Sequence, residues 1–346
     1  MKIAIFVRDM VSPGGAERSM ETLKESLEED HEVELFSVVG GEDEISSFKL
    51  PLPYEMKALM TYLESLWKKD IDDFDPDLIL TQHELSYLAY RYSKKNDAEM
   101  FLFLRDYSML YNERYWGKYS VDAAANYLLS FVRERFTHRI IDQSSKIIAN
   151  SDYIGEKYRE YYGIETETVY PFVEIEDYKV ENTGDKILHV NPTEGKGIRL
   201  TLEVAEKMPG EKFIVAGNVK DPEIEERMAK LDNVEHLGYV ENMKEVYRQT
   251  KIVLMPSKWE EPYGRIPVEA GASGIPTIAT DRGGLSESVG VEELLVDYSV
   301  DAFMEKIREV EDKYDEYSNM VRENAEERRK EKQVQKIREM IDENGK

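Results

Sequence analysis

Two glutamates, Glu261 and Glu269, flank a glycine-containing turn in the second half of the chain, with seven residues between them. Pro267 suits the first position of a helix, because its missing N–H would have no helical partner there. The start of that helix would present free N–H groups and the positive end of the helix dipole, which favour an anion such as phosphate. Carboxylates beside it can accept hydrogen bonds from hydroxyls, so the turn suits a phosphorylated sugar. Either glutamate alone is better explained as a favourable acidic residue near a helix start.

An apolar segment precedes this turn and another follows it. The run 252–256 predicts a fully buried parallel strand ahead of the turn. Gly274 can end the short apolar helix that follows it. Ligands of open parallel sheets bind at the carboxyl ends of the strands, and the turn falls at such an end.

Two further loops carry glycine between an expected strand and an expected helix. The first contains Gly14 and Gly15, and the second contains Lys196 and Gly197. Glycine permits a positive φ and close approach of the backbone, and a lysine at a helix start is a point charge suited to a diphosphate. Neither loop has the Gly-x-Gly-x-x-Gly or the P-loop pattern. A plain turn explains the first loop equally well, whereas Lys196 is favoured as a ligand residue because it lies at the same strand ends as Glu261.

The apolar pattern predicts an α/β protein made of two doubly wound, Rossmann-like domains, with a ligand between them at the carboxyl ends of the strands. Expected strands of the first domain are 2–7, 33–38, 78–81, 100–104 and 146–150, with helices at 16–29, 55–69, 84–95, 121–143 and 152–162. Expected strands of the second are 186–191, 212–217, 234–237, 252–256, 276–280 and 293–296, with helices between them. We therefore expect domains at 1–172 and 173–313, and then a charged helix at 314–346 that either lies across both domains or is solvated.

Composition narrows the class of protein. The 346 residues exceed one ordinary core, and 41% of them are hydrophobic. No run of about 18 apolar residues could span a membrane, and the first apolar run is too short for a signal peptide, so we expect a cytoplasmic protein. This acidic protein has a net charge of −25, which repels nucleic acid. The absence of cysteine excludes disulfides and thiolate metal sites.

Acidic and histidine residues show no convincing metal-ligand pattern. The segment 70–77 contains Asp-x-Asp spacings, but its place ahead of an apolar strand favours a solvated acidic turn. The 5 histidines have no His-x-x-x-His spacing. We expect no catalytic metal and no cofactor.

The segment 105–140 is rich in aromatic and basic residues for so acidic a chain. That combination suits a membrane interface or a lipid-diphosphate acceptor, and aromatic rings also stack on sugars. A helical pair with half-buried tyrosines accounts for the same composition. Packing of such a helical pair explains the composition better than membrane contact does. An acceptor-binding role is nevertheless favoured over packing for at least part of the segment.

The second half of the chain resembles the retaining glycosyltransferases of family four, the glycosyl transferases group 1, which have the GT-B fold. The landmarks that keep the family's order across about 186–297 are 196–197, 213–217, 237–240, 256–257, 261–269, 272–276 and 283–287. The Gly-Gly-Ala-Glu turn at 14–17 and the segment 148–151 match the family in the first half.

The resemblance implies hexosyltransferase-like transfer of a sugar from a nucleotide-diphosphate sugar to an acceptor hydroxyl, in polysaccharide, glycolipid or glycan assembly. It implies that Glu269 binds the ribose hydroxyls, that Glu261 binds the transferred sugar and that Lys196 neutralises the diphosphate. Further donor contacts are implied at Gly14, Gly15, Gly197, Gly238, Tyr239, Tyr263, Gly264, Arg265 and Ile266. The first domain would serve a sugar or lipid-linked acceptor. Peripheral contact with the cytoplasmic membrane face stays an open alternative, which the composition of 105–140 raises and the resemblance does not. Retention through a same-face route is implied by the resemblance alone.

Two positions depart from the family pattern. Asn191 stands where the family often has an arginine five residues before the lysine, so Lys196 would share the diphosphate with another cation such as Arg265. Many members show His-Asp at the end of the fourth strand, where this chain has Arg105 and Asp106. These two residues are therefore the expected substitutes for a histidine contact to the sugar.

Other function classes share this architecture. A GT-B-type sugar-nucleotide epimerase is not excluded by the sequence, whereas a dehydrogenase is disfavoured by the missing Gly-x-Gly-x-x-Gly. A catalytically silent sugar-binding scaffold is a third class. The intact set Lys196, Glu261 and Glu269 argues against it.

Overall fold

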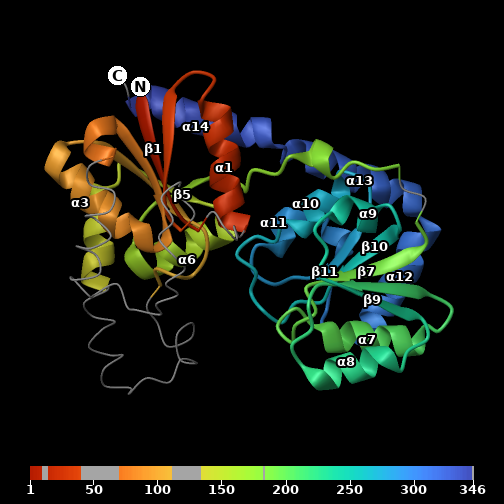
Figure 1. Ribbon diagram of the computed structural model, residues 1–346. Coiled ribbons are helices and arrows are strands. Elements are labelled where there is room, and N and C mark those ends of the chain that lie inside the picture. Colours follow the sequence, from red (N-terminus) through yellow and green to blue (C-terminus); the bar gives the residue numbers. More distant parts are fainter. Residues whose placement is uncertain (10–14, 40–69, 111–133, 182–183, 345–346) are drawn as a thin grey trace, which may run out of the picture. The chain divides into compact units, whose positions relative to one another are not determined.

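The structure, a computed structural model, describes residues 1–9, 15–39, 70–110, 134–181 and 184–344 (Figure 1). The chain forms two compact units: Met1–Phe172 with Gln333–Lys346, and Val173–Lys332. Each unit contains a 6-stranded sheet whose neighbouring strands run parallel. The expected α/β class with two Rossmann-like domains is confirmed.

The sheet of the first unit has the strand order β2-β1-β3-β4-β5-β6. Its strands are β1 (Lys2–Asp9), β2 (Glu32–Val39), β3 (Leu78–Gln82), β4 (Glu99–Leu104), β5 (Lys146–Ala149) and β6 (Glu167–Thr168). Its helices include α1 (Gly15–Leu27), the short η1 (His83–Leu85), α3 (Ser86–Asn96), α6 (Asp152–Tyr162) and most of α14 (Lys330–Asn344). Residues 70–74 and 134–143 are helical too. The expected helices at 55–69 and over most of 121–143 lie outside the described residues.

Alternation along β1 sends side chains to both faces of this sheet. Ala4 and Phe6 belong to the buried cluster that α3 and α6 cover. Ile3, Ile5 and Val7 belong to the opposite cluster, which α1 and α14 cover. The near-continuous apolar strands seen in the sequence are therefore buried on both faces, as expected for a parallel sheet.

The second unit has the strand order β12-β11-β10-β7-β8-β9. Its strands are β7 (Lys186–Val190), β8 (Lys212–Ala216), β9 (Val234–Gly238), β10 (Thr250–Met255), β11 (Thr277–Thr280) and β12 (Leu295–Val296). Its helices are η2 (Ile175–Asp177), α7 (Ile198–Lys207), α8 (Pro222–Ala229), α9 (Met243–Tyr247), α10 (Ile266–Gly271), α11 (Leu285–Val289), η3 (Glu292–Leu294), α12 (Val300–Asp312) and α13 (Tyr314–Glu327). Because β7 and β10 are neighbours, the loops that follow them emerge side by side at the carboxyl edge.

The C-terminal stretch differs from the single helix expected at 314–346. It forms α13, which packs in the core of the second unit, and α14, most of which belongs to the first. Between them Arg329 forms an isolated parallel bridge with Val173, and Lys330 N donates to Val173 O at 3.2 Å. These backbone bonds to a distant segment interrupt the helix, and neither proline nor glycine marks the break.

His189, in the middle of β7, is a buried histidine whose Nδ1 lies 2.8 Å from Thr201 Oγ1. Burial, with a smaller effect of the Lys196 charge, lowers its pKa to about 3. An unfolded histidine takes up a proton near pH 6.5, at its ordinary pKa. Between about pH 6.5 and 3 the unfolded chain therefore binds the extra proton, and stability falls as the pH falls.

We expect His189→Asn to reduce this acid slope by up to about 1.4 kcal/mol per pH unit, the value of one proton. Urea unfolding at a series of pH values measures the slope for both proteins. Only the pH dependence of the unfolding free energy is compared, because the substitution also changes packing and therefore the free energy at every pH. Parallel pH curves for the variant and the wild type would contradict the assignment.

Candidate functional site

The loops after β7 and β10 are bonded to each other. Lys258 N and Trp259 N both donate to Gly195 O, at 2.9 and 3.2 Å. Gly197 has a φ of 76°, and a Cβ there would lie 1.8 Å from the carbonyl oxygen of Pro256. Only glycine fits this approach, so Gly197 is required for the two loops to meet.

This junction brings Lys196 and Glu261 together as an ion pair between Nζ and Oε1. The Ser257 hydroxyl donates to the same carboxylate oxygen at 2.9 Å, and the backbone of Ser257 is held by a 2.7 Å bond from Thr280 Oγ1. The Glu261 side chain is 5% exposed, whereas that of Lys196 is 27% exposed. A buried carboxylate thus faces a lysine that solvent, or a ligand, can reach.

The backbone of Glu261 is fixed by the turn after β11. Glu261 forms an isolated bridge with Gly283, and Gly284 N donates to Glu261 O at 2.7 Å. Gly283 has a φ of 66°, and a Cβ there would fall 2.2 Å from Glu261 O. The Gly-Gly dipeptide is therefore explained by close backbone contact with the acidic turn.

Glu269 lies in the first turn of α10, which begins at Ile266 rather than at Pro267. The Glu269 carboxylate is buried. Tyr247 donates its hydroxyl to Glu269 Oε2 at 3.1 Å, and Arg265 Nε lies 3.3 Å from Glu269 Oε1. The second expected acid is thus positioned by partners different from those of Glu261.

The remaining expected donor contacts occupy the same sheet edge or the turn beside it. Gly264 has a φ of 84°, and a Cβ there would lie 2.8 Å from Leu285 Cδ2. Tyr263 is buried next to it. Gly238 ends β9 with a φ of 66°, and the Tyr239 side chain that follows is 71% exposed. An exposed ring at the carboxyl end of a strand is free to stack on a planar group.

In the first unit the two expected substitutes for a histidine point to different surroundings. Arg105 is buried, donates from Nε to Gln82 Oε1 at 3.2 Å, and lies 4.7 Å from the ring centre of Phe103. Asp106 is half-buried and accepts from Ser108 N at 2.7 Å. Gly15 is exposed at the start of α1, and Gly14 lies outside the described residues.

Sequence reasoning missed His83, which directly follows β3. Its φ is 51°, a left-handed value that few residues other than glycine adopt, although histidine adopts it more often than most. Its Nδ1 lies 3.2 Å from Ser108 Oγ and 3.6 Å from Asp106 Oδ1. Because β3 and β4 are neighbours, the residues after them meet at one edge, and the strand order was the signal needed to find this contact. Tyr247 was missed as well, because its partner Glu269 is 22 positions away. Ser257 was recognised as part of the landmark 256–257, but its bond to Glu261 was not predicted.

The described ranges contain neither a metal-ligand cluster nor a membrane-spanning helix. There, no group of three or more His, Cys, Asp or Glu is arranged to hold a metal ion. In the same ranges, no helix combines the length and the apolar character needed to cross a bilayer. The aromatic and basic segment 105–140 falls largely on 111–133, outside the described residues, so its acceptor role stays a prediction.

Comparisons with known proteins identify the family of this chain. The family model "Glycosyl transferases group 1" matches residues 174–328, and the model "Glycosyltransferase Family 4" matches 13–177. An uncharacterized 42.6 kDa protein in the cps region of Klebsiella pneumoniae is 26% identical over 79% of this chain and 83% of its own length. The lipopolysaccharide core biosynthesis mannosyltransferase LpsB of Rhizobium meliloti is 38% identical, but over only 22% of this chain and 24% of its own length.

Solved structures share the architecture. Anabaena Alr3699/HepE, solved in complex with UDP-glucose, superposes with a TM-score of 0.75 over 99% of this chain and 100% of that chain. Its sequence identity is 18%, so this likeness supports the fold alone.

Proposed function

Because the chain belongs to the family-four glycosyltransferases, whose two models together match residues 13–328, we propose that it transfers a sugar from a nucleotide-diphosphate sugar with retention of configuration. The observation that carries this proposal is the contact between Lys196 and the buried Glu261 at the carboxyl edge of the second sheet. A cation for the diphosphate and an acceptor of sugar hydroxyls are thereby held in one place. An acceptor hydroxyl receives the sugar.

A bound donor would replace the ion pair between Lys196 and Glu261 with contacts to itself. Lys196 would turn from Glu261 to the diphosphate, and sugar hydroxyls would take its place on the carboxylate. Each charge would thus keep a partner, so the desolvation cost of a buried, unpaired carboxylate is avoided. Glu269 would accept from the ribose, and backbone groups at Gly264, Arg265 and Ile266 would contact the diphosphate beside it. Gly197 would bring backbone close to the diphosphate from the other loop.

The chemistry in this proposal is stabilisation of the leaving group. The bond between C1 of the sugar and the phosphate oxygen breaks, the acceptor oxygen bonds to C1 on the same face, and the acceptor proton passes to the departing phosphate. Lys196 supplies positive charge where negative charge develops. A two-carboxylate mechanism of the glycosidase kind is not assigned, because Glu261 and Glu269 are both bound to other side chains. We propose that no metal is needed, and turnover in excess chelator tests this.

The acceptor side of the proposal is assigned to the first unit. A sugar or lipid-linked acceptor in polysaccharide, glycolipid or glycan assembly is consistent with the names of two similar proteins, one from a cps region and one from lipopolysaccharide core biosynthesis. Arg105 and Asp106 are the proposed contacts. We place the protein in the cytoplasm. Peripheral membrane contact is the alternative that flotation with anionic liposomes at low salt tests, and an absence of binding removes it.

A thermal-shift panel of UDP-, GDP- and ADP-sugars against NAD tests the donor class. One nucleotide class is expected to stabilise the protein by about 2.7 kcal/mol at a concentration 100-fold above its Kd. Release of the nucleoside diphosphate should then require an acceptor. Interconversion of the sugar without that requirement would indicate an epimerase, and stabilisation by NAD alone would overturn the donor assignment.

A further inference from the structure

Tyr247 ends α9, outside every motif that the sequence singled out. It is completely buried, and its hydroxyl donates to Glu269 Oε2 at 3.1 Å. Burial, and then the adjacent Glu269 charge, raise its pKa well above the ordinary value of 10. The phenol therefore keeps its proton at neutral pH and remains a donor to this carboxylate.

The two oxygens of Glu269 have different neighbours. Oε2 accepts from Tyr247, while Oε1 lies 3.3 Å from Arg265 Nε. A carboxylate has about four lone-pair sites on its two oxygens, so each oxygen keeps room for one more donor. Held in this way, the group can accept from two neighbouring hydroxyls without first rotating.

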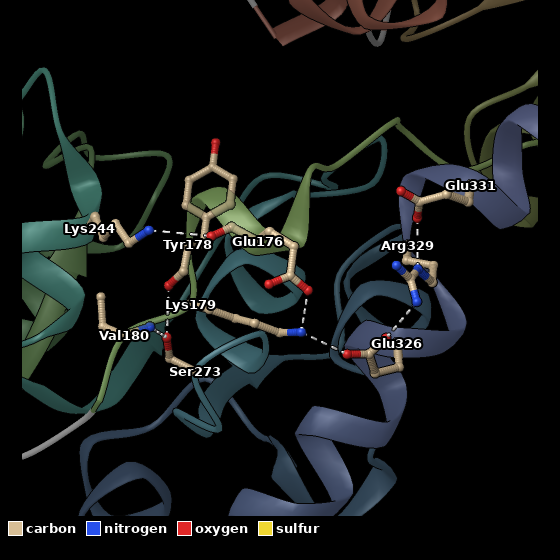
Figure 2. A network of polar contacts seen from close by, with 9 residues as sticks. All are labelled: Glu176, Tyr178, Lys179, Val180, Lys244, Ser273, Glu326, Arg329 and Glu331. Carbon is tan, nitrogen blue, oxygen red and sulfur yellow. Dashed lines mark hydrogen bonds and ion pairs between the residues drawn. The ribbon is translucent and has the colours of Figure 1, made fainter. Parts of the chain in front are cut away.

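Tyr247 is itself held by the segment that enters the second unit. Its ring packs edge-to-face on Tyr178, with ring centres 6.1 Å apart. Figure 2 shows how Tyr178 is fixed: its carbonyl accepts from Ser273 Oγ at 2.7 Å, and Val180 N donates to the same hydroxyl at 2.9 Å. Ser273 lies just after α10, the helix that carries Glu269. The tyrosine that supports Tyr247 is thus bonded to the end of the helix that carries Glu269.

The same segment is also bound to α9. Lys244, on the helix that ends with Tyr247, donates from Nζ to Glu176 O at 3.3 Å (Figure 2). On the other side, Lys179 bridges Glu176 and Glu326, the latter on α13, at 2.5 and 3.1 Å. The segment that packs against Tyr247 is therefore bonded to α9, to Ser273 just after α10, and to α13.

We propose that Tyr247 is a positioning residue that fixes the Glu269 carboxylate to accept from the two adjacent hydroxyls of a nucleotide ribose. This inference rests on the proposed function, in which Glu269 binds the ribose. Without the phenol hydroxyl, Arg265 alone would hold the carboxylate, at Oε1. Part of the ordering of Oε2 would then occur only when the nucleotide binds, and affinity would fall by that ordering cost. The loss should concern the ribose hydroxyls and spare the remainder of the nucleotide.

The test is Tyr247→Phe, with affinities measured by calorimetry for UDP, ADP and GDP and for their 2′-deoxy counterparts. For the nucleotide that the wild type binds most tightly, the wild type should prefer the ribose form by about tenfold or more. In the variant that preference should shrink severalfold, because the ribose form loses affinity and the deoxy form changes little. The kcat at saturating donor should stay within about threefold, since the chemistry at C1 is elsewhere.

Tyr317→Phe is the matched control. Tyr317 is another buried tyrosine of the second unit and donates to a different carboxylate, Glu309 Oε1, at 2.8 Å. Its substitution removes the same atom from a bond to another carboxylate, one that is only partly buried, so the nucleotide preference should stay at the wild-type ratio. Should Tyr247→Phe fail to fold, Tyr178→Leu removes the supporting ring instead and should shrink the same preference.

The outcomes separate the two proposals. If Glu269→Ala loses the ribose preference and Tyr247→Phe retains it fully, the positioning role is wrong and the proposed function stands. If the wild type binds no nucleotide, or Glu269→Ala keeps the full preference, the ribose role of Glu269 fails and the role of Tyr247 fails with it. Should only Tyr178→Leu be measurable, an unchanged preference would overturn the positioning role.

Discussion

Lys196→Met is expected to slow sugar transfer by about 10²–10³-fold at saturating donor, the loss that follows removal of one preorganised group at a developing negative charge. The Lys196 ammonium lies against Glu261 at the carboxyl edge of the sheet, where the diphosphate is proposed to bind. Methionine keeps an unbranched side chain and removes the charge. Single-turnover kinetics with a nucleotide sugar and an accepted hydroxyl compound measure the rate.

A neighbouring lysine supplies the control. Lys258 belongs to the adjoining loop, pairs with Glu194 and lies 5.5 Å from the ring centre of Tyr298. Lys258→Met removes the same charge from the same pair of loops without touching Glu261, so the rate should stay within about threefold. A Lys196→Met enzyme as fast as the Lys258→Met enzyme would show that leaving-group stabilisation lies elsewhere.

Stability must be separated from catalysis in this experiment. Removing Lys196 leaves the buried Glu261 without its cation, which is costly for folding. Adding Glu261→Gln removes that unpaired charge and should restore part of the thermal stability without restoring the rate. Because Glu261→Gln is itself expected to be slow, the reference is the Glu261→Gln single variant. A stable double variant that is slower than Glu261→Gln assigns the additional rate loss to the missing Lys196 ammonium.

Local sequence patterns predicted most of the second sheet. The strand, loop and helix units around Lys196 and Glu261 follow from apolar runs, glycine and proline, because these signals act over a few residues. β6 was missed, since its two residues carry almost no pattern. The break between α13 and α14 was missed as well, because it depends on bonds to Val173 rather than on local sequence.

Contacts inside the site were less predictable than the elements that carry them. Sequence order does not reveal that β7 lies beside β10, yet this neighbourhood creates the contact between Lys196 and Glu261. Tyr247 reaches Glu269 across 22 positions, and no spacing rule covers such a pair. Gly283 was recognisable as a family landmark, but its purpose is visible only where a Cβ would meet the carbonyl of Glu261.

Glu261→Gln and Glu269→Ala are expected to affect sugar transfer and nucleotide binding differently, because the two carboxylates are assigned to different parts of the donor. Glu261→Gln keeps the bond from Ser257 possible and removes the charge that would hold sugar hydroxyls. A hydrogen bond to a charged group is worth about 1.5–3 kcal/mol. The value of kcat/KM for the nucleotide sugar should therefore fall by about 10- to 150-fold, while the Kd of the free nucleoside diphosphate changes by less than about threefold.

Glu269→Ala, in contrast, should weaken the binding of the nucleoside diphosphate itself. It removes the carboxylate that Tyr247 and Arg265 hold, so the thermal shift given by the nucleoside diphosphate alone should disappear. Calorimetry with the nucleotide and steady-state kinetics with the nucleotide sugar measure both effects on both variants. Equal losses in the two assays for both variants would mean that the acids act as one structural unit. The assignment of Glu261 to the sugar and Glu269 to the ribose requires that Glu261→Gln lowers kcat/KM alone, whereas Glu269→Ala lowers both kcat/KM and nucleotide binding. General damage to the loop would weaken the binding of every donor fragment in both variants.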